Sequence, residues 1–156
     1  MRIFLEKKRE GLFLLVFFVI ACLLRFFQFS IFEFKNDQFA AIELGKATKQ
    51  ACFLVTHGIM SSINVYNPPL FTWFMGAVVY YTENPFYITL IFCLVNILAL
   101  FLCLRYFLFR LPALYATIAS SLVAFSPAFT IYSSNIWAQC LLPLPMILFY
   151  MNIHNL

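Results

Sequence analysis

The sequence predicts an all-α integral membrane protein. We expect about four transmembrane helices, an amphipathic helix on the outer face, and a re-entrant or juxtamembrane helix that begins at a Pro-Pro-Leu motif. Two observations predict this class. Of the 156 residues, 64% are hydrophobic and 10% are charged, whereas a soluble domain is about 45–50% apolar and about 25% charged. The hydrophobic residues are also grouped into long runs, which excludes an intrinsically disordered chain.

The first predicted span covers residues 11–32 and follows a cytoplasmic tail, residues 1–10. A run of about 22 residues crosses a hydrocarbon core of about 30 Å at 1.5 Å per residue. The tail carries Arg2, Lys7, Lys8 and Arg9. Because basic residues accumulate on the cytoplasmic side, the N-terminus is predicted to lie in the cytoplasm. The charge of +4 has no clustered basic face, so nucleic acid is not an expected partner.

Residues 33–85 form the predicted outer loop, and a short amphipathic helix is expected over residues 37–51 within it. Helical spacing puts small apolar side chains on one side and polar ones on another. The weak apolar face favours a helix lying at the membrane surface among membrane lipids. The apolar positions are Ala40, Leu44, Ala47 and Ala51, and the polar positions are Glu43, Lys46 and Gln50.

The segment from Pro68 to Tyr81 has two interpretations. It is apolar but about 14 residues long, and runs of this length are more often re-entrant or interfacial than spanning. If it does not cross the membrane, Arg105 and Arg110 lie on the cytoplasmic side, as the positive-inside rule favours. If it crosses, both arginines lie outside. We favour the non-crossing interpretation.

Three further spans are predicted at residues 86–104, 111–128 and 136–151, so the whole chain is predicted as a single membrane domain. Pro143 and Pro145 are expected to kink the last span, because proline removes a backbone hydrogen bond. Trp73, Tyr80 and Tyr81 are typical of an aromatic belt at the membrane interface.

Two ionisable residues have competing interpretations. Arg25 lies inside the first span, where a charged side chain is costly and is therefore a functional candidate. The alternative is that its side chain snorkels to the interface. His57, in the outer loop, is a candidate ligand or base, but a lone loop histidine is more often a surface group. No second histidine or cysteine stands at metal-ligand spacing, so no metal site is predicted.

Asp37 is the carboxylate with the strongest catalytic potential. It follows the first span at the start of a predicted helix. A carboxylate in an interfacial cleft can act as a general base on a hydroxyl, since partial desolvation raises its pKa. The competing interpretation is that Asp37, or Asn36 before it, is an N-cap of the helix. The two roles are compatible.

The order of short motifs resembles the N-terminal part of the GT-C membrane glycosyltransferases. The nearest group comprises the protein mannosyltransferases and the aminoarabinose or dolichyl-phosphate-mannose-type transferases. The resemblance covers roughly residues 10–150. Its motifs are Asn36-Asp37-Gln38, the segments 58–62 and 66–73, then 125–129, 133–137 and 141–143.

The resemblance implies that Asp37 is the catalytic base for sugar transfer from a polyprenyl-phosphate donor to a lipid, glycan or protein acceptor. It also implies an outer-face reaction in a bacterial inner membrane. Two positions depart from the family pattern: Gln38 replaces a second acid, and Asn67 replaces a basic residue. No cofactor is predicted, and the use of a divalent metal is left open. The implied substrate-binding residues are Gln38, His57, Ser61, Ser62, Asn67, Pro68 and Pro69.

Length gives a further expectation and an alternative. Members of the family are longer, so we expect this chain to be a fragment that is inactive alone and has the missing C-terminal part as a partner. The alternative is a small non-enzymatic polytopic subunit or a transporter fragment. That alternative predicts a specific co-purifying partner and no dependence on Asp37.

Overall fold

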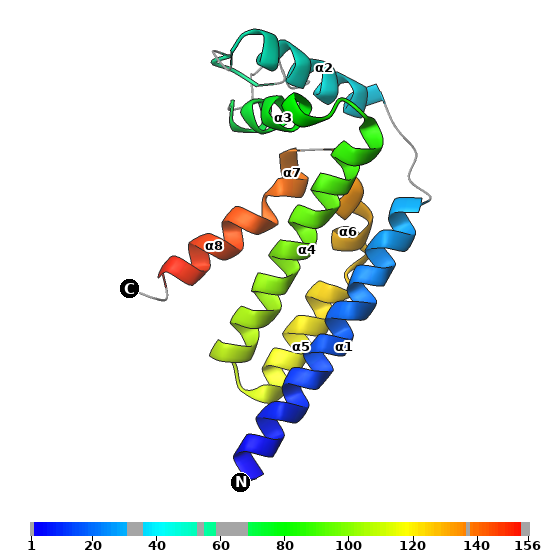
Figure 1. Ribbon diagram of the computed structural model, residues 1–156. Helices are drawn as coiled ribbons and strands as arrows, with labels where there is room; N and C mark the ends of the chain where they lie inside the picture. Colours follow the sequence, from blue (N-terminus) through cyan, green and yellow to red (C-terminus); the bar gives the residue numbers. More distant parts are fainter. Residues whose placement is uncertain (1, 31–35, 53–54, 59–68, 137, 154–156) are drawn as a thin grey trace. The chain divides into compact units, whose positions relative to one another are not determined.

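The structure, a computed structural model, describes residues 2–30, 36–52, 55–58, 69–136 and 138–153. Every regular element in these ranges is a helix, and no strand occurs in them, which confirms the all-helical prediction for the described residues (Figure 1). The elements are α1 (Arg2–Ser30), α2 (Asn36–Gln50), α3 (Leu70–Tyr81), α4 (Pro85–Arg110), α5 (Ala113–Ala124), α6 (Pro127–Ile131), the 3-10 helix η1 (Tyr132–Ser134), α7 (Ala138–Leu141) and α8 (Pro143–Ile153).

The chain divides into two compact units. The first, here called the α1–α5 unit, comprises Met1–Phe32, Phe92–Asn135 and Gln139–Leu156. The second, the α2–α3 unit, comprises Glu33–Ile91 and Ile136–Ala138. The first turns of α4 therefore belong to the α2–α3 unit, and the rest of α4 belongs to the α1–α5 unit.

Small side chains form the centre of the α1–α5 unit. α1 and α5 pack against each other (Figure 1). A buried cluster joins Ala21 of α1, Leu100 and Leu104 of α4, and Ala124 of α5, with Phe18 packed against it. Alanine at such crossings lets two helix backbones approach closely, as is common where helices associate in lipid.

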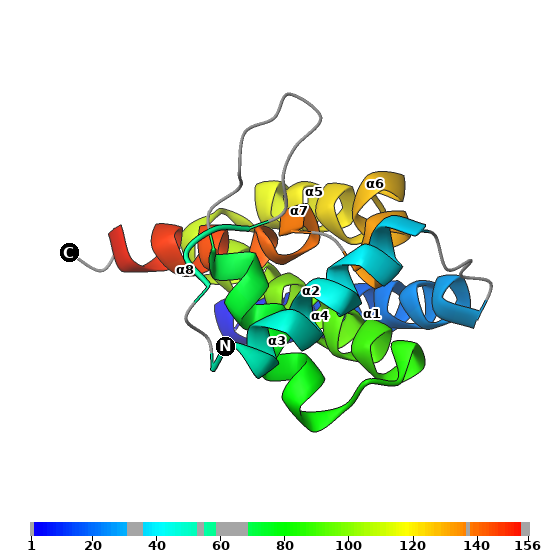
Figure 2. The same cartoon turned by 90° about the horizontal axis from the view of Figure 1, so that it is seen from above.

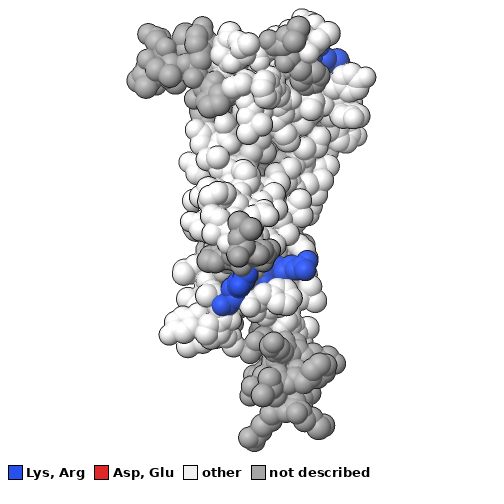
Figure 3. Space-filling model, turned by 90° about the vertical axis from the view of Figure 1, so that its left-hand side faces the viewer, with Lys and Arg blue, Asp and Glu red and all other residues white. Residues whose placement is uncertain are grey.

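Large apolar side chains cover the outside of the α1–α5 unit. Phe27, Leu114 and Leu122 are each more than 60% exposed, while Arg25, Asn96 and Ser120 are buried. Figure 3 shows one face of the molecule, on which uncharged atoms predominate over the few Lys and Arg side chains. Polar groups inside and large apolar groups outside are the arrangement expected of a protein surrounded by lipid.

One helix of the described chain is long and apolar enough to cross a membrane. It is α4, with 26 residues and a mean hydropathy of 2.6. The prediction of four transmembrane helices is not confirmed, because the other apolar helices are shorter. They are Gly11–Phe27, Leu70–Tyr81, Ala113–Ala124 and Ala138–Ile153.

Prolines explain two of these shorter helices. The predicted span at 111–128 is interrupted, because α5 ends at Ala124 and Ser126 is extended (ψ 122°) before Pro127 begins α6. The predicted span at 136–151 is divided into α7 and α8, with the break immediately before Pro143. The residue before a proline is disfavoured in the α conformation, and proline donates no backbone hydrogen bond.

The α2–α3 unit is built on a close helix pair. Figure 2 shows α2 and α3 against each other, and they share the most extensive helix–helix contact in the described chain. Gly45 of α2 makes this approach possible. A Cβ atom added there would lie 2.8 Å from Cγ2 of Val79, and 3.0 Å from the backbone oxygen of Met75.

The buried face of α2 differs from the predicted one. Ala40, Ala47 and Ala51 are exposed, and Leu44 is half-buried, so the predicted apolar face is wrong. The reason is the close approach of α3, which selects narrow side chains rather than the most apolar row. The buried positions of α2 are Gln38, Ala41, Ile42, Gly45 and Thr48.

Candidate functional site

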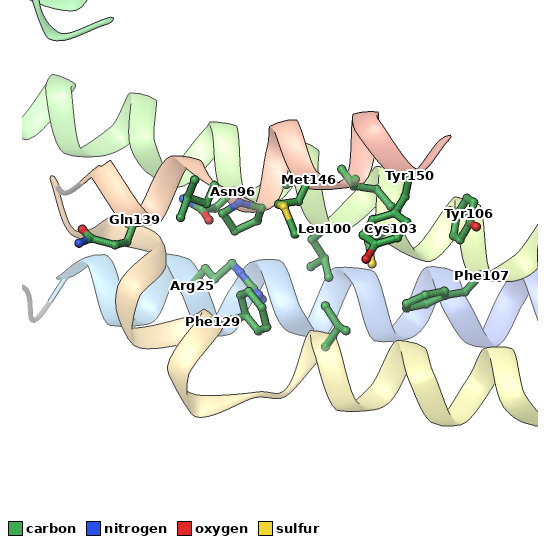
Figure 4. A pocket seen from close by; sticks show the side chains of 15 residues that line it. Arg25, Asn96, Leu100, Cys103, Tyr106, Phe107, Phe129, Gln139, Met146 and Tyr150 are labelled. Carbon is green, nitrogen blue, oxygen red and sulfur yellow. The ribbon is translucent and has the colours of Figure 1, made fainter. Parts of the chain in front are cut away.

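A cavity of about 670 Å³ lies inside the α1–α5 unit (Figure 4). Ligand pockets in proteins have volumes of about 300–1,000 Å³, so this cavity has the size of a small-molecule site. Its wall is mostly apolar, with a single cationic side chain. The lining residues are Arg25, Asn96, Ala99, Leu100, Cys103, Tyr106, Phe107, Val123, Phe129, Gln139, Leu142, Pro143, Met146, Ile147 and Tyr150.

Arg25 supplies the cation, and it is 2% exposed. Its Nη1 donates hydrogen bonds to the backbone oxygen of Ala21 at 3.0 Å and to that of Ala124 at 3.2 Å. Ala124 is the last residue of α5, where carbonyls lack helical partners and the helix dipole is negative. The snorkelling interpretation is therefore wrong, because the guanidinium is held inside the unit.

Part of the Arg25 guanidinium is left without a partner. Its Nε is buried and makes no hydrogen bond. Among the described residues, no Asp or Glu forms an ion pair with it. Figure 4 shows the side chain reaching from α1 toward Phe129 at the cavity wall. A buried donor without a partner is costly, so an acceptor in the cavity would stabilise it.

Asn96 is a second polar group at the cavity wall. Its Nδ2 donates to the backbone oxygen of Phe92 at 3.0 Å and to that of Ser133 at 3.3 Å. It thereby connects α4 to η1 on the opposite side of the chain's sequence. Sequence reasoning missed Asn96, although one amide inside the apolar run of α4 is a signal for a functional or structural contact.

The cavity is partly open at its surface. Phe129, Leu142, Met146 and Tyr150 line it and are also exposed. A ligand with an apolar part can therefore lie against these side chains while a polar part reaches Arg25. Sequence reasoning did not predict this cavity, because its wall combines residues from helices far apart in the chain.

The structure describes the predicted outer-loop residues only in part. Asp37 is the second residue of α2, and its side chain lies outside the described residues, as do Ser61, Ser62, Asn67 and Pro68. Gln38 is described and is buried, with 1% of its surface exposed.

The other two described candidates lie in the α2–α3 unit as well. His57 is exposed, and its Nδ1 is 3.3 Å from Oγ1 of Thr56. Pro69 immediately precedes α3 and is half-buried.

Packing places the helix that begins at Asn36 and the helix that follows Pro69 in one unit. Ion pairs support this pairing: Nζ of Lys49 lies 3.5 Å from Oε1 of Glu83, which follows α3. Nζ of Lys46 lies 2.8 Å from Oε1 of Glu43 and 4.0 Å from Oε2 of Glu83. The hydrogen bond to Glu43 raises the pKa of Lys46, so this lysine stays cationic at neutral pH.

An aromatic contact completes the unit. Nε1 of Trp73 donates to the backbone oxygen of Val55 at 2.9 Å, and Nζ of Lys49 lies 5.9 Å from the ring centre of Tyr80. Trp73, Tyr80 and Tyr81 are exposed, as residues of a membrane-interface belt are expected to be.

Comparison with known proteins gives no relative: no family model matches the chain, and neither curated proteins nor solved structures yield a match.

Proposed function

We propose that the chain is the N-terminal part of a glycosyltransferase that uses a polyprenyl-phosphate sugar on the outer face of a membrane. The observation that carries the proposal is the combination of motif order and packing. The Asn36-Asp37-Gln38 motif begins α2, the Pro-Pro-Leu motif leads into α3, and these helices pack into one unit. Motifs far apart in the sequence would thus serve one site.

The proposed topology has four spans, with α2 and α3 outside and the N-terminus in the cytoplasm of a bacterial cell. Two observations support it. α4 is apolar and long enough to cross a bilayer. Its end, with Arg110 in the last turn, lies at the end of the α1–α5 unit where α1 begins (Figure 1). Arg105, Arg110 and the basic residues of the N-terminus would then share the cytoplasmic side.

In the proposed reaction, Asp37 is the general base. It takes the proton of an acceptor hydroxyl while the hydroxyl oxygen forms a bond to the anomeric carbon. The bond from that carbon to the phosphate oxygen breaks, and the polyprenyl phosphate leaves with the electron pair. Position supports this role: the first turn of a helix favours an ionised carboxylate, which is the form that a base requires.

The function is tested by comparing membranes from cells with the intact gene and from cells with the gene deleted. The membranes receive radiolabelled hexoses and pentoses attached to polyprenyl phosphate. We expect transfer of one of these sugars to a lipid, glycan or protein only when the gene is present. Equal incorporation in both membranes, for every donor, would reject the glycosyltransferase proposal and favour the non-enzymatic subunit.

A further inference from the structure

We infer that the cavity of the α1–α5 unit binds a single-chain lipid with an oxyanion head, and that Arg25 recognises the head. The inference does not rest on the proposed glycosyltransferase function. It rests on the buried, unpartnered Nε of Arg25 in a cavity whose wall is otherwise mostly apolar.

The charge at the cavity selects the head. Arg25 is buried, and no described carboxylate pairs with it. The two carbonyl oxygens that it contacts carry only partial charges, so the guanidinium retains most of its positive charge. A carboxylate or a phosphate monoester would accept a charge-assisted hydrogen bond from Nε and neutralise this cation.

The shape and chemistry of the wall select the tail. Leu100, Val123, Pro143, Met146 and Ile147 supply apolar surface, and the cavity volume of about 670 Å³ exceeds what a bare phosphate requires. The exposure of Met146 and Tyr150 provides an open edge for an alkyl chain. Lipid is therefore favoured over a free inorganic anion as the source of the head.

The test uses the purified full chain in nanodiscs of zwitterionic phosphatidylcholine. The probe is an alkyl monophosphate with a photoreactive diazirine on its chain. Its competitors are dodecyl phosphate, dodecanoate, dodecanol and inorganic phosphate. We expect the crosslinks to map to residues that line the cavity, and we expect dodecyl phosphate or dodecanoate to compete. Dodecanol and inorganic phosphate are expected to compete weakly.

Arg25→Gln removes the cation and is expected to weaken probe binding about tenfold or more, since a hydrogen bond to a charged group is being lost. Arg105→Gln is the matched control, because Arg105 is exposed on α4 and does not line the cavity. Binding in this control is expected to be unchanged.

Arg25→Gln also removes the hydrogen bond to Ala124, so a second variant is needed if the protein fails to fold. Met146→Trp keeps Arg25 and adds bulk at an exposed lining position. We expect it to lower crosslinking about tenfold by occupying the space of the chain. Unchanged crosslinking in a folded Arg25→Gln or Met146→Trp protein would overturn the inference. Equal competition by dodecanol or by inorganic phosphate, or crosslinks outside the cavity, would also overturn it.

Discussion

Replacing Asp37 with Asn at the native gene locus is expected to lower sugar transfer by about 10²–10⁴-fold. General base catalysis contributes a factor of this size, and an amide cannot accept the proton of the acceptor hydroxyl. Asparagine keeps the length of the side chain and is also a good residue for a helix N-terminus, so α2 is expected to persist. The measurement is the initial rate of radiolabelled sugar transfer in isolated membranes at saturating donor.

Glu43→Gln is the matched control for this substitution. Glu43 lies on the same helix, is exposed, and pairs with Lys46. Its conversion to an amide removes a carboxylate at the surface of α2 without touching the proposed base, so transfer is expected to stay near the wild-type rate. If Asp37→Asn retained the wild-type rate, Asp37 would have no part in the chemistry and would be only a residue of the helix start.

The second large effect concerns the packing of α2 on α3. Gly45→Leu is expected to destabilise the α2–α3 unit by about 3 kcal/mol, at the upper end of the usual cost of overpacking. The first carbon of the new side chain would already lie 3.0 Å from the backbone oxygen of Met75 and 3.1 Å from its carbonyl carbon. Backbone cannot move aside as a flexible side chain can, so the helices must separate.

Limited trypsin digestion measures this separation, because Lys46 and Lys49 lie on α2. If cleavage follows the population of the open form, 3 kcal/mol corresponds to about a 100-fold faster cut at these sites. Ala47→Leu adds bulk to the same helix at an exposed position and is expected to leave the rate unchanged. Equal cleavage rates in the two variants would show that α2 and α3 do not pack through Gly45.

Local patterns in the sequence predicted several elements closely. The helix expected over residues 37–51 is α2 (Asn36–Gln50), and the helix expected after Pro68 is α3 (Leu70–Tyr81). These elements were predictable because prolines and polar residues mark their ends. The long apolar run after Pro85 likewise predicted α4, which continues beyond Leu104 to Arg110.

Features that depend on contacts between distant residues were not predictable. The buried face of α2 is set by how closely Met75 and Val79 approach Gly45, and no periodicity in α2 alone contains that information. Arg25 was recognised as unusual, but its contact with Ala124 joins residues 99 positions apart. The cavity depends on α1, α4, α6 and α8 together, so it became visible only in the folded chain.

The proposed function requires that the α2–α3 unit faces the outside, and Cys52 is a built-in probe of this orientation. Cys52 is an exposed free thiol two residues after α2. In sealed right-side-out vesicles, a membrane-impermeant maleimide is expected to label the protein, and Cys52→Ser is expected to abolish the labelling. Arg105→Cys in the Cys52→Ser background is expected to react only after the vesicles are opened. Labelling of Cys52 only in opened vesicles would place Asp37 on the cytoplasmic side and contradict an outer-face glycosyltransferase.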